Sequence, residues 1–480
     1  MRADLGPATV PDDVKGARVF RLTSPIRPYD WGSTTAIATL LGREPSGDPE
    51  AELWLGAHPD SPSTIAPGEP AAGSRLDAVI AREPVATLGA GVAERFDGRL
   101  PFLMKVLAAG APLSLQVHPT IAQAEAGYDA EDAAGVARDA AERNYKDRNH
   151  KPEMIYALSD FAALSGFREP GRTAALLREV LAALDGDADE PHHGGVTLLG
   201  ELADLLSGDA PAAADADAPS GGSSGGSSGG SSGGSSGGSS GGSSGGDPRL
   251  RDAFARVFDR PEDAARAAEA LGTLDPRRFS AGSADSVATA VDLQARYPGD
   301  PGVVVSLLLN RVSLAPGEAL YLPAGNVHAY LSGLGIEVMA ASDNVLRGGL
   351  TSKHVDVPEL LTTVRFAALG VPELPAVETE WGQRVFAPPF DEFALQVLDF
   401  GAAPGDDSTS GDLPVLQHGP AIVLVTDGAL VLDSPNGSLR VCRGEAVFIP
   451  AAEAPVMARP ADTGTTGRTR AFATTVAREF

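Results

Sequence analysis

The hydrophobic positions along the chain change their spacing twice. From Val19 to about Ser165 the apolar residues fall in short runs, such as 102–107 and 113–117, that are separated by glycine and proline. Runs of this length between turn-forming residues predict short strands joined by turns. Strand-type runs return at Val303 and continue to the end of the chain. We therefore expect two strand-rich regions on either side of a segment with a different period.

Between about residues 169 and 296 the apolar side chains recur every three or four positions. This spacing places them on one face of a helix and predicts a group of amphipathic helices. The positions are Leu177, Val180, Leu181 and Leu184, then Leu198, Leu202 and Leu205, then Leu250, Phe254, Val257 and Phe258. A run of glycine and serine at about 208–247 interrupts the group, and its composition predicts a disordered surface loop without chemistry.

The C-terminal strand-rich region contains an internal repeat. Residues 316–328 (PGEALYLPAGNVH) align with residues 443–455 (RGEAVFIPAAEAP) at a constant offset of 127 residues. Each copy has a glycine turn, an acidic residue, a short apolar strand and a turn that begins with proline, which is the rhythm of a cupin or jelly-roll barrel. His328 in the first copy corresponds to Pro455 in the second, and a proline side chain cannot bind a metal. A chance recurrence in a chain rich in glycine and proline is the alternative.

These patterns predict a mainly β protein with an α-helical insertion, built from two cupin-like (jelly-roll) β-barrels and a helical domain. We expect residues 1–165 and 297–385 to form a catalytic barrel. The helical insertion is expected at 166–296, and a C-terminal barrel without metal ligands at 386–480.

The charge balance excludes several classes of partner. The chain has 38 Lys and Arg residues against 64 Asp and Glu residues, a formal net charge of -26. Nucleic acid and anionic membranes attract basic surfaces, so we expect neither as a partner. No apolar run reaches the roughly 18 residues that span a bilayer, and the start lacks the layout of a signal peptide. We expect a cytoplasmic monomer whose single cysteine, Cys442, forms no internal disulfide and no thiolate metal site.

Lysine is rare, and its placement is informative. Codon bias towards arginine explains the scarcity, because arginine can replace lysine at most positions. It does not explain why four of the five lysines fall in segments that also hold His118, Glu153 and Arg347, where a compact ammonium group differs from a guanidinium. The five are Lys15, Lys105, Lys146, Lys151 and Lys353.

Four residues from separate segments could bind a metal through nitrogen and oxygen. Gln116 and His118 are two positions apart and therefore project from the same face of a strand. Such a pair alone is more often structural. Glu153 lies in a basic stretch, which could instead be a solvated charged turn, and His328 lies in an apolar setting where a histidine is usually a core residue. Together they offer an amide, a carboxylate and two imidazoles, a donor set that suits a borderline metal without any cysteine.

Seven segments, in order, resemble one enzyme family. They are YDWGS (29–33), AELWLGAHP (51–59), LPFLMKVL (100–107), SLQVHP (114–119), NHKPEM (149–154), YLPAGNVHAYL (321–331) and EVMAASDNVLR (337–347). The family is that of the type I mannose-6-phosphate isomerases, or phosphomannose isomerases. The match runs from about residue 18 to 358 and is looser in the C-terminal barrel. Asp30 stands where alanine is commoner, which leaves the metal set untouched.

The resemblance implies reversible conversion of D-mannose 6-phosphate to D-fructose 6-phosphate through a cis-enediol, feeding mannose and GDP-mannose metabolism. It implies one zinc ion per chain, held by Gln116, His118, Glu153 and His328, and a catalytic role for Arg347. The alternative from another class is a non-catalytic sugar-phosphate-binding cupin.

The other roles that the resemblance implies concern the substrate and the proton. Ser114, Lys105 and Lys353 are candidates to hold the phosphate, and Lys151 could assist proton transfer. Trp31 and His58 are further candidate substrate contacts. The general base stays open between Glu337, Lys151 and His58 at this stage.

Overall fold

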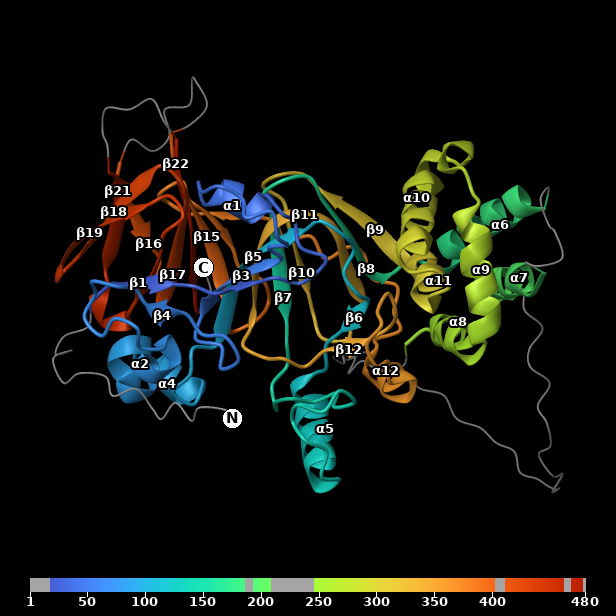
Figure 1. Cartoon of the computed structure of the whole chain (residues 1–480), viewed down its shortest axis with the longest axis horizontal. Coiled ribbons are helices and arrows are strands. Elements are labelled where there is room, and N and C mark those ends of the chain that lie inside the picture. The colour runs from blue at the N-terminus through green and yellow to red at the C-terminus, as the bar shows by residue number, and fades with distance from the viewer. Residues whose placement is uncertain (1–17, 186–192, 209–245, 402–410, 462–467, 478–480) are drawn as a thin grey trace, which may run out of the picture.

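The computed structural model describes residues 18–185, 193–208, 246–401, 411–461 and 468–477. Within these residues strands predominate, as the sequence predicts, and most of the larger helices gather at one end of the molecule (Figure 1). None of the described helices combines the length and the apolar character needed to cross a membrane.

A ten-stranded sheet carries the candidate site residues and is organised around one long strand, β11 (His328–Ala340). Because β11 pairs with four different strands, residues from four separate chain segments come to lie beside it. The other strands of this sheet are β2 (Ile26–Arg27), β3 (Glu52–Gly56), β5 (Phe102–Ala109), β6 (Gln116–Val117), β7 (Glu153–Ala157), β8 (Phe161–Phe167), β9 (Leu309–Leu314), β10 (Ala319–Leu322) and β12 (Leu346–Arg347).

Two further sheets contain the C-terminal strands. The eight-stranded sheet consists of β13 (Val377–Glu378), β14 (Arg384–Phe386), β15 (Ala394–Phe400), β22 (Thr469–Thr475), β17 (Ala421–Asp427), β20 (Ala446–Ile449), β1 (Phe20–Thr23) and β4 (Thr64–Ile65). The four-stranded sheet consists of β16 (Leu413–Val415), β21 (Val456–Pro460), β18 (Ala429–Ser434) and β19 (Gly437–Cys442). The N-terminal β1 therefore hydrogen-bonds to a C-terminal strand, with Phe20 opposite Phe448. The division into domains stays a prediction.

The repeated motif forms the same local structure in both copies. β10 and β20 occupy positions that differ by the 127 residues expected from the sequence, and both are buried strands or nearly so. The glycine that precedes each strand has a positive φ, +100° at Gly317 and +83° at Gly444. The two copies thus share a left-handed turn followed by a strand.

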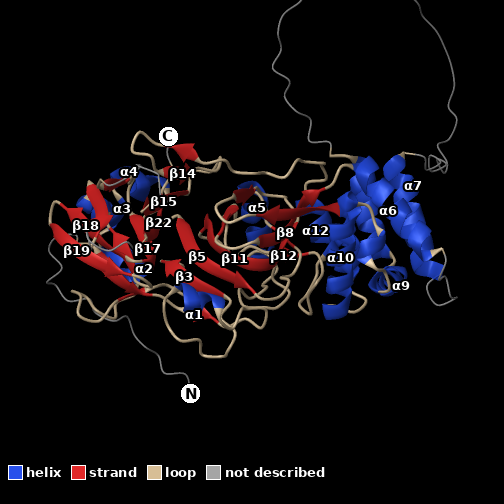
Figure 2. Cartoon of the chain, turned by 90° about the horizontal axis from the view of Figure 1, so that it is seen from above, coloured by secondary structure: helices blue, strands red, loops and turns tan. Residues whose placement is uncertain are grey.

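Helices fill the segment where the apolar period predicts them. They are α6 (Pro170–Leu184), α7 (His193–Ser207), α8 (Pro248–Asp259), α9 (Pro261–Gly272) and α10 (Ala281–Arg296), and Figure 2 shows them beside the strands. The predicted apolar faces are buried, as Leu177, Leu198 and Phe254 at 0% exposure illustrate. Most of the glycine and serine run lies outside the described residues.

Several helices occur where the sequence predicts strands. They are α1 (Ala36–Leu40), α2 (Leu76–Arg82), α3 (Pro84–Leu88), α4 (Ala90–Arg95), α5 (Ile121–Ala133), α11 (Pro301–Leu308) and α12 (Val357–Thr363). The strand prediction was wrong at α5 because Thr120 and Gln123 form a capping box that starts a helix. It was wrong at Val303 because Asp300 caps α11 and Pro301 begins it. A short, fully buried apolar run has no period that separates helix from strand.

The repeat offers a matched test of backbone strain. Alanine at Gly317 or Gly444 has to adopt a left-handed conformation, which costs about 1–2 kcal/mol. At Gly444 the added Cβ would also lie 2.5 Å from the Leu41 carbonyl oxygen, whereas at Gly317 its nearest neighbour is 3.6 Å away. We expect Gly444→Ala to lower the melting temperature clearly more than Gly317→Ala, as measured by thermal unfolding. Equal losses in the two variants would contradict this packing.

Candidate metal centre

Three buried side chains converge from three strands of the ten-stranded sheet. His118 directly follows β6, Glu153 begins β7 and His328 begins β11. Their exposed fractions are 1%, 2% and 3%, and one potential ligand atom of each lies within 4.8 Å of the others. The sequence predicts these three as ligands, and the structure brings them together.

The register of the short strand β6 brings Gln116 to the same place. Gln116 lies opposite His328 of β11 on one side and opposite Arg347 of β12 on the other. Gln116, Glu153 and His328 line one cavity. The fourth predicted ligand and the predicted catalytic arginine are therefore neighbours of the three convergent side chains.

Hydrogen bonds to backbone carbonyls orient both imidazole rings. His118 Nδ1 lies 2.8 Å from the Asn344 carbonyl oxygen, and His328 Nδ1 lies 3.0 Å from the Asn326 carbonyl oxygen. A carbonyl only accepts, so each Nδ1 carries a proton, and the Nε2 of the neutral ring presents a lone pair. This is the usual way in which a protein prepares histidine to bind a metal.

The two Nε2 atoms both face the carboxylate of Glu153. His118 Nε2 lies 3.3 Å from Glu153 Oε1, and His328 Nε2 lies 3.3 Å from Glu153 Oε2. His118 Nε2 is buried and has no hydrogen-bond partner. Acceptors facing one another at this distance repel, and a cation between them relieves the repulsion. The donor set of two imidazoles, a carboxylate and an amide therefore fits a divalent metal such as zinc.

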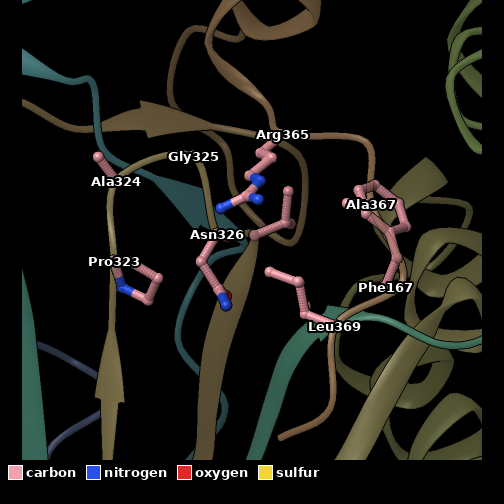
Figure 3. Close-up of a pocket in the computed structure, with 10 residues that line it drawn as sticks. Phe167, Pro323, Ala324, Gly325, Asn326, Arg365, Ala367 and Leu369 are labelled. Atoms are coloured by element: carbon pink, nitrogen blue, oxygen red, sulfur yellow. The ribbon is translucent and has the colours of Figure 1, made fainter. Parts of the chain in front are cut away.

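A turn at residues 323–326 supports both histidines from behind. Its Gly325 N–H donates to the His118 carbonyl oxygen, and its Asn326 carbonyl accepts from His328. Behind the turn lies a small pocket, in which Figure 3 shows the side chains of Asn326 and Arg365 with Phe167 and Leu369 at one side. The turn thus couples the positions of two ligands that are far apart in sequence.

The electrostatic environment keeps Glu153 and His118 in the protonation states that metal binding requires. Lys151 Nζ donates to Glu153 Oε1 at 2.5 Å. Burial alone would raise the pKa of Glu153, but the Lys151 ammonium opposes burial, and the pKa lies well below its usual range. Burial, together with the Lys151 ammonium, lowers the pKa of His118 to about 4. At neutral pH the carboxylate is therefore ionised and the His118 ring is neutral.

A second buried charge network shares the metal cavity. Lys105 Nζ lies 2.9 Å from Glu337 Oε2 and 3.5 Å from Glu52 Oε1, and all three residues line the cavity. Burial raises the pKa of Glu337, with Glu153 and Glu52 acting in the same direction against Lys105. The charge of Lys105 is thus compensated by two carboxylates, which makes it a poor partner for a phosphate.

The predicted phosphate-binding groups near Arg347 have a different environment. Burial lowers the pKa of Arg347, and burial followed by Arg347 and Lys146 lowers the pKa of Lys353. The positive charges of Arg347 and Lys353 are therefore close enough to repel one another, and a bound anion would reduce this repulsion. Ser114 is half-buried and lies two residues before Gln116 in the same extended segment.

His58 and Trp31 lie outside the residues that line the metal cavity. His58 packs edge-on against Trp54, and its Nε2 lies 3.5 Å from Asp343 Oδ1. Burial lowers the pKa of His58 to about 4, so the ring is neutral at pH 7. Trp31 stacks on Tyr29 with ring centroids 5.7 Å apart. Among the candidate bases, Glu337 and Lys151 face the cavity and His58 does not.

The sequence analysis missed several buried residues that hold the site together. Glu52 binds Lys105 and also accepts a hydrogen bond of 2.8 Å from Trp54 Nε1. Asn344 is fully buried and accepts backbone hydrogen bonds from Lys146 and Asp147 through Oδ1 while its carbonyl orients His118. Both lie inside the segments of the family resemblance, which was the available signal. Their roles depend on contacts across 53 and 226 residues, which no local pattern reveals.

Comparisons with known proteins point to one family. A model of the phosphomannose isomerase type I catalytic domain matches residues 19–170. A curated mannose-6-phosphate isomerase of Escherichia coli (strain K12) is 37% identical over 442 residues, covering 91% of this chain and 96% of its own. One of Shigella flexneri is 36% identical over 445 residues with the same coverage. Mannose-6-phosphate isomerase 1 of Arabidopsis thaliana is 28% identical over 454 residues.

Solved structures give the same result. A mutant of phosphomannose isomerase from Salmonella typhimurium shares 33% identity with a TM-score of 0.75, covering 96% of this chain and 100% of its own. A structure of mannose 6-phosphate isomerase from Salmonella typhimurium bound to fructose 6-phosphate and zinc shares 34% identity with a TM-score of 0.74, again covering 96% of this chain.

The metal set can be tested by metal content alone. His118 and His328 each present Nε2 towards Glu153, so we expect His118→Ala and His328→Ala to weaken zinc binding by more than about 100-fold. A loss of about 100-fold is the upper limit for residues that only hydrogen-bond to a metal ligand. The measurement is zinc per chain by atomic emission after dialysis. The exposed His354→Ala is the matched control and should keep its zinc. Full zinc in either ligand variant would remove that residue from the set.

Proposed function

The chain belongs to the family of type I phosphomannose isomerases, and we propose that it interconverts mannose 6-phosphate and fructose 6-phosphate at the site of His118, Glu153 and His328. The observation that carries this proposal is that the imidazoles of His118 and His328, each oriented by a backbone carbonyl, converge on the buried, ionised carboxylate of Glu153. The relatives that cover most of the chain are mannose-6-phosphate isomerases, and one solved relative holds both fructose 6-phosphate and zinc. The chain is accordingly an aldose–ketose isomerase.

Zinc is the cofactor, and the residues to hold it are Gln116, His118, Glu153 and His328. Two neutral imidazoles, one neutral amide and one carboxylate leave a net charge of plus one on the filled site. Bound there, zinc supplies a Lewis acid that orients and polarises oxygens of the sugar.

The protein's own groups have to move a proton between two sugar carbons. In the cis-enediol route a base removes the proton from C2 of the aldose, the electron pair forms the C1–C2 double bond, and the carbonyl π pair of C1 moves to O1, which takes up a proton. The C2 hydroxyl then loses its proton to form the ketone, and the double-bond pair takes up a proton at C1. Glu337 is our candidate for this base, because it lines the cavity and burial keeps its pKa raised. Lys151, which also lines the cavity, is the candidate to exchange a proton with the sugar oxygens.

Two cations next to the ligands suit the negative charges of the reaction. Negative charge develops on the sugar oxygens as the enediolate forms, so a fixed cation there lowers the barrier. Arg347 is our candidate, since the strand register puts it opposite the ligand Gln116. Lys353, close enough to Arg347 to feel its charge, is the candidate to bind the phosphate with Ser114. Lys105 instead serves to hold Glu337 and Glu52.

The wider expectations rest on the sequence alone. We infer two cupin-like barrels around the three sheets, with the helical insertion between segments of the first. A link to GDP-mannose metabolism, a cytoplasmic location, a monomeric state and the lack of nucleic-acid or membrane partners stay predictions.

Two charge-removing variants separate the proposed roles of Arg347 and Lys353. Arg347→Ala should lower kcat by about 100- to 1,000-fold while zinc stays bound, because it removes a group that acts on the developing charge. Lys353→Ala should mainly raise KM for mannose 6-phosphate, about tenfold, because it removes a contact made equally in the ground state. Both are measured in a coupled assay together with metal content. Wild-type kcat in Arg347→Ala would refute its role.

A further inference from the structure

A hollow of about 480 Å³ lies between the helices and the ten-stranded sheet, apart from the metal cavity. It is bordered by the end of β8, by α6, by the start of α10 and by β9, segments that lie near one another in Figure 1. None of its lining residues lines the metal cavity. Its volume is in the range of small-molecule sites, about 300–1,000 Å³.

Three arginines line this hollow in a chain whose net charge is -26: Arg168, Arg172 and Arg311. Arg168 donates to Ser286 Oγ at 2.6 Å, and Arg311 donates to Thr289 Oγ1 at 3.1 Å. Ser286 and Thr289 are three residues apart on α10, so they share one face of that helix. Both guanidinium groups therefore bind the same face of α10.

The hydrogen-bond partners of Arg168 and Arg311 are neutral groups. Arg168 also donates to the Leu309 carbonyl oxygen at 3.1 Å, and Arg311 donates to Ser313 Oγ at 3.0 Å. Burial, with Arg172 nearby, lowers the pKa of Arg168, and burial lowers the pKa of Arg311. Among the described residues, no ion pair joins any of the three guanidinium groups to a carboxylate. A half-buried cation without a counter-charge costs free energy that a bound anion would recover.

The carboxylates in the neighbourhood do not fill this role. Glu169 accepts hydrogen bonds from the N–H groups of Gly171 and Arg172 at the start of α6. Glu179 accepts from the Ser280 N–H and from the hydroxyls of Ser280 and Ser283 at the start of α10. Asp285 attracts Arg311 without forming an ion pair with it. Glu179 and Asp285 line the hollow too, but the three arginines outnumber them, so the lining carries a net positive charge.

We propose that this hollow, which we call the arginine hollow, binds a phosphomonoester of a small organic molecule. Planar guanidinium groups bind phosphate oxygens in pairs, and three cations suit a group that carries nearly two negative charges at pH 7. The hollow is larger than a phosphate ion requires, and Leu176, Ala281 and Val371 give its wall an apolar part that suits the organic portion. The ligand site is distinct from the isomerisation site.

Titration calorimetry with glycerol 2-phosphate tests the proposal, because this phosphomonoester has no carbonyl group to isomerise. The wild-type chain is expected to show a saturable binding component that Arg172→Ala weakens about tenfold. Arg172 is exposed and donates no side-chain hydrogen bond in the described structure, so this variant should keep its melting temperature and its turnover of mannose 6-phosphate. The exposed Arg251→Ala removes the same charge from α8 and is the matched control.

A further variant separates the hollow from the metal cavity. Any binding of the probe in the metal cavity should weaken in Lys353→Ala, whereas binding in the arginine hollow should persist there. Identical isotherms for the wild type and Arg172→Ala would overturn the proposal, and so would equal losses in Arg172→Ala and Arg251→Ala. Repeating the titration with inorganic phosphate shows how much of the affinity the phosphoryl group supplies. Weaker binding of either glycerol 2-phosphate or inorganic phosphate to Arg172→Ala supports the site.

Discussion

The burial of the Glu153 carboxylate is the constraint on which the rest of the site depends. An ionised group that is 2% exposed is strongly unfavourable unless opposite charges and hydrogen-bond donors surround it. Lys151 supplies one charge at 2.5 Å, and the Nε2 atoms of the two histidines face its oxygens, an arrangement that a cation bound between them stabilises. Strand β11, with its four partners, holds the three elements in this arrangement. The candidate metal site therefore depends on the groups that compensate the buried charge of Glu153.

The distribution of positive charge follows from the same requirement. A chain with a net charge of -26 repels an anionic substrate over most of its surface. Four of its five lysines nevertheless lie at or near the site: Lys105 and Lys151 line the cavity, Lys353 lies near Arg347, and Lys146 lies near Lys353. Lys105 neutralises buried carboxylates, whereas Arg347 and Lys353 have no such partner among the described residues. Local positive charge is thus kept where an anion has to enter.

The sequence predicts most of what depends on local pattern and less of what depends on distant contacts. The apolar period correctly predicts α6 to α10, and the repeat correctly places β10 and β20. The sequence prediction misses α5 and α11, where capping residues start a helix in a segment whose apolar runs resemble strands. The candidate ligands His118, Glu153 and His328 could be named because the family motifs contain them. Glu52 and Asn344 could not, because their function arises only when the strands pair and bring distant segments together.

The central claim is that a metal held by Glu153 and its neighbours is required for isomerisation of mannose 6-phosphate. The most direct test is a coupled assay of mannose 6-phosphate turnover before chelation, after exhaustive chelation and after addition of zinc, with the metal content measured in each sample. The account predicts that activity falls with the zinc content and returns when zinc is restored. Undiminished turnover in protein shown to be free of metal would contradict it.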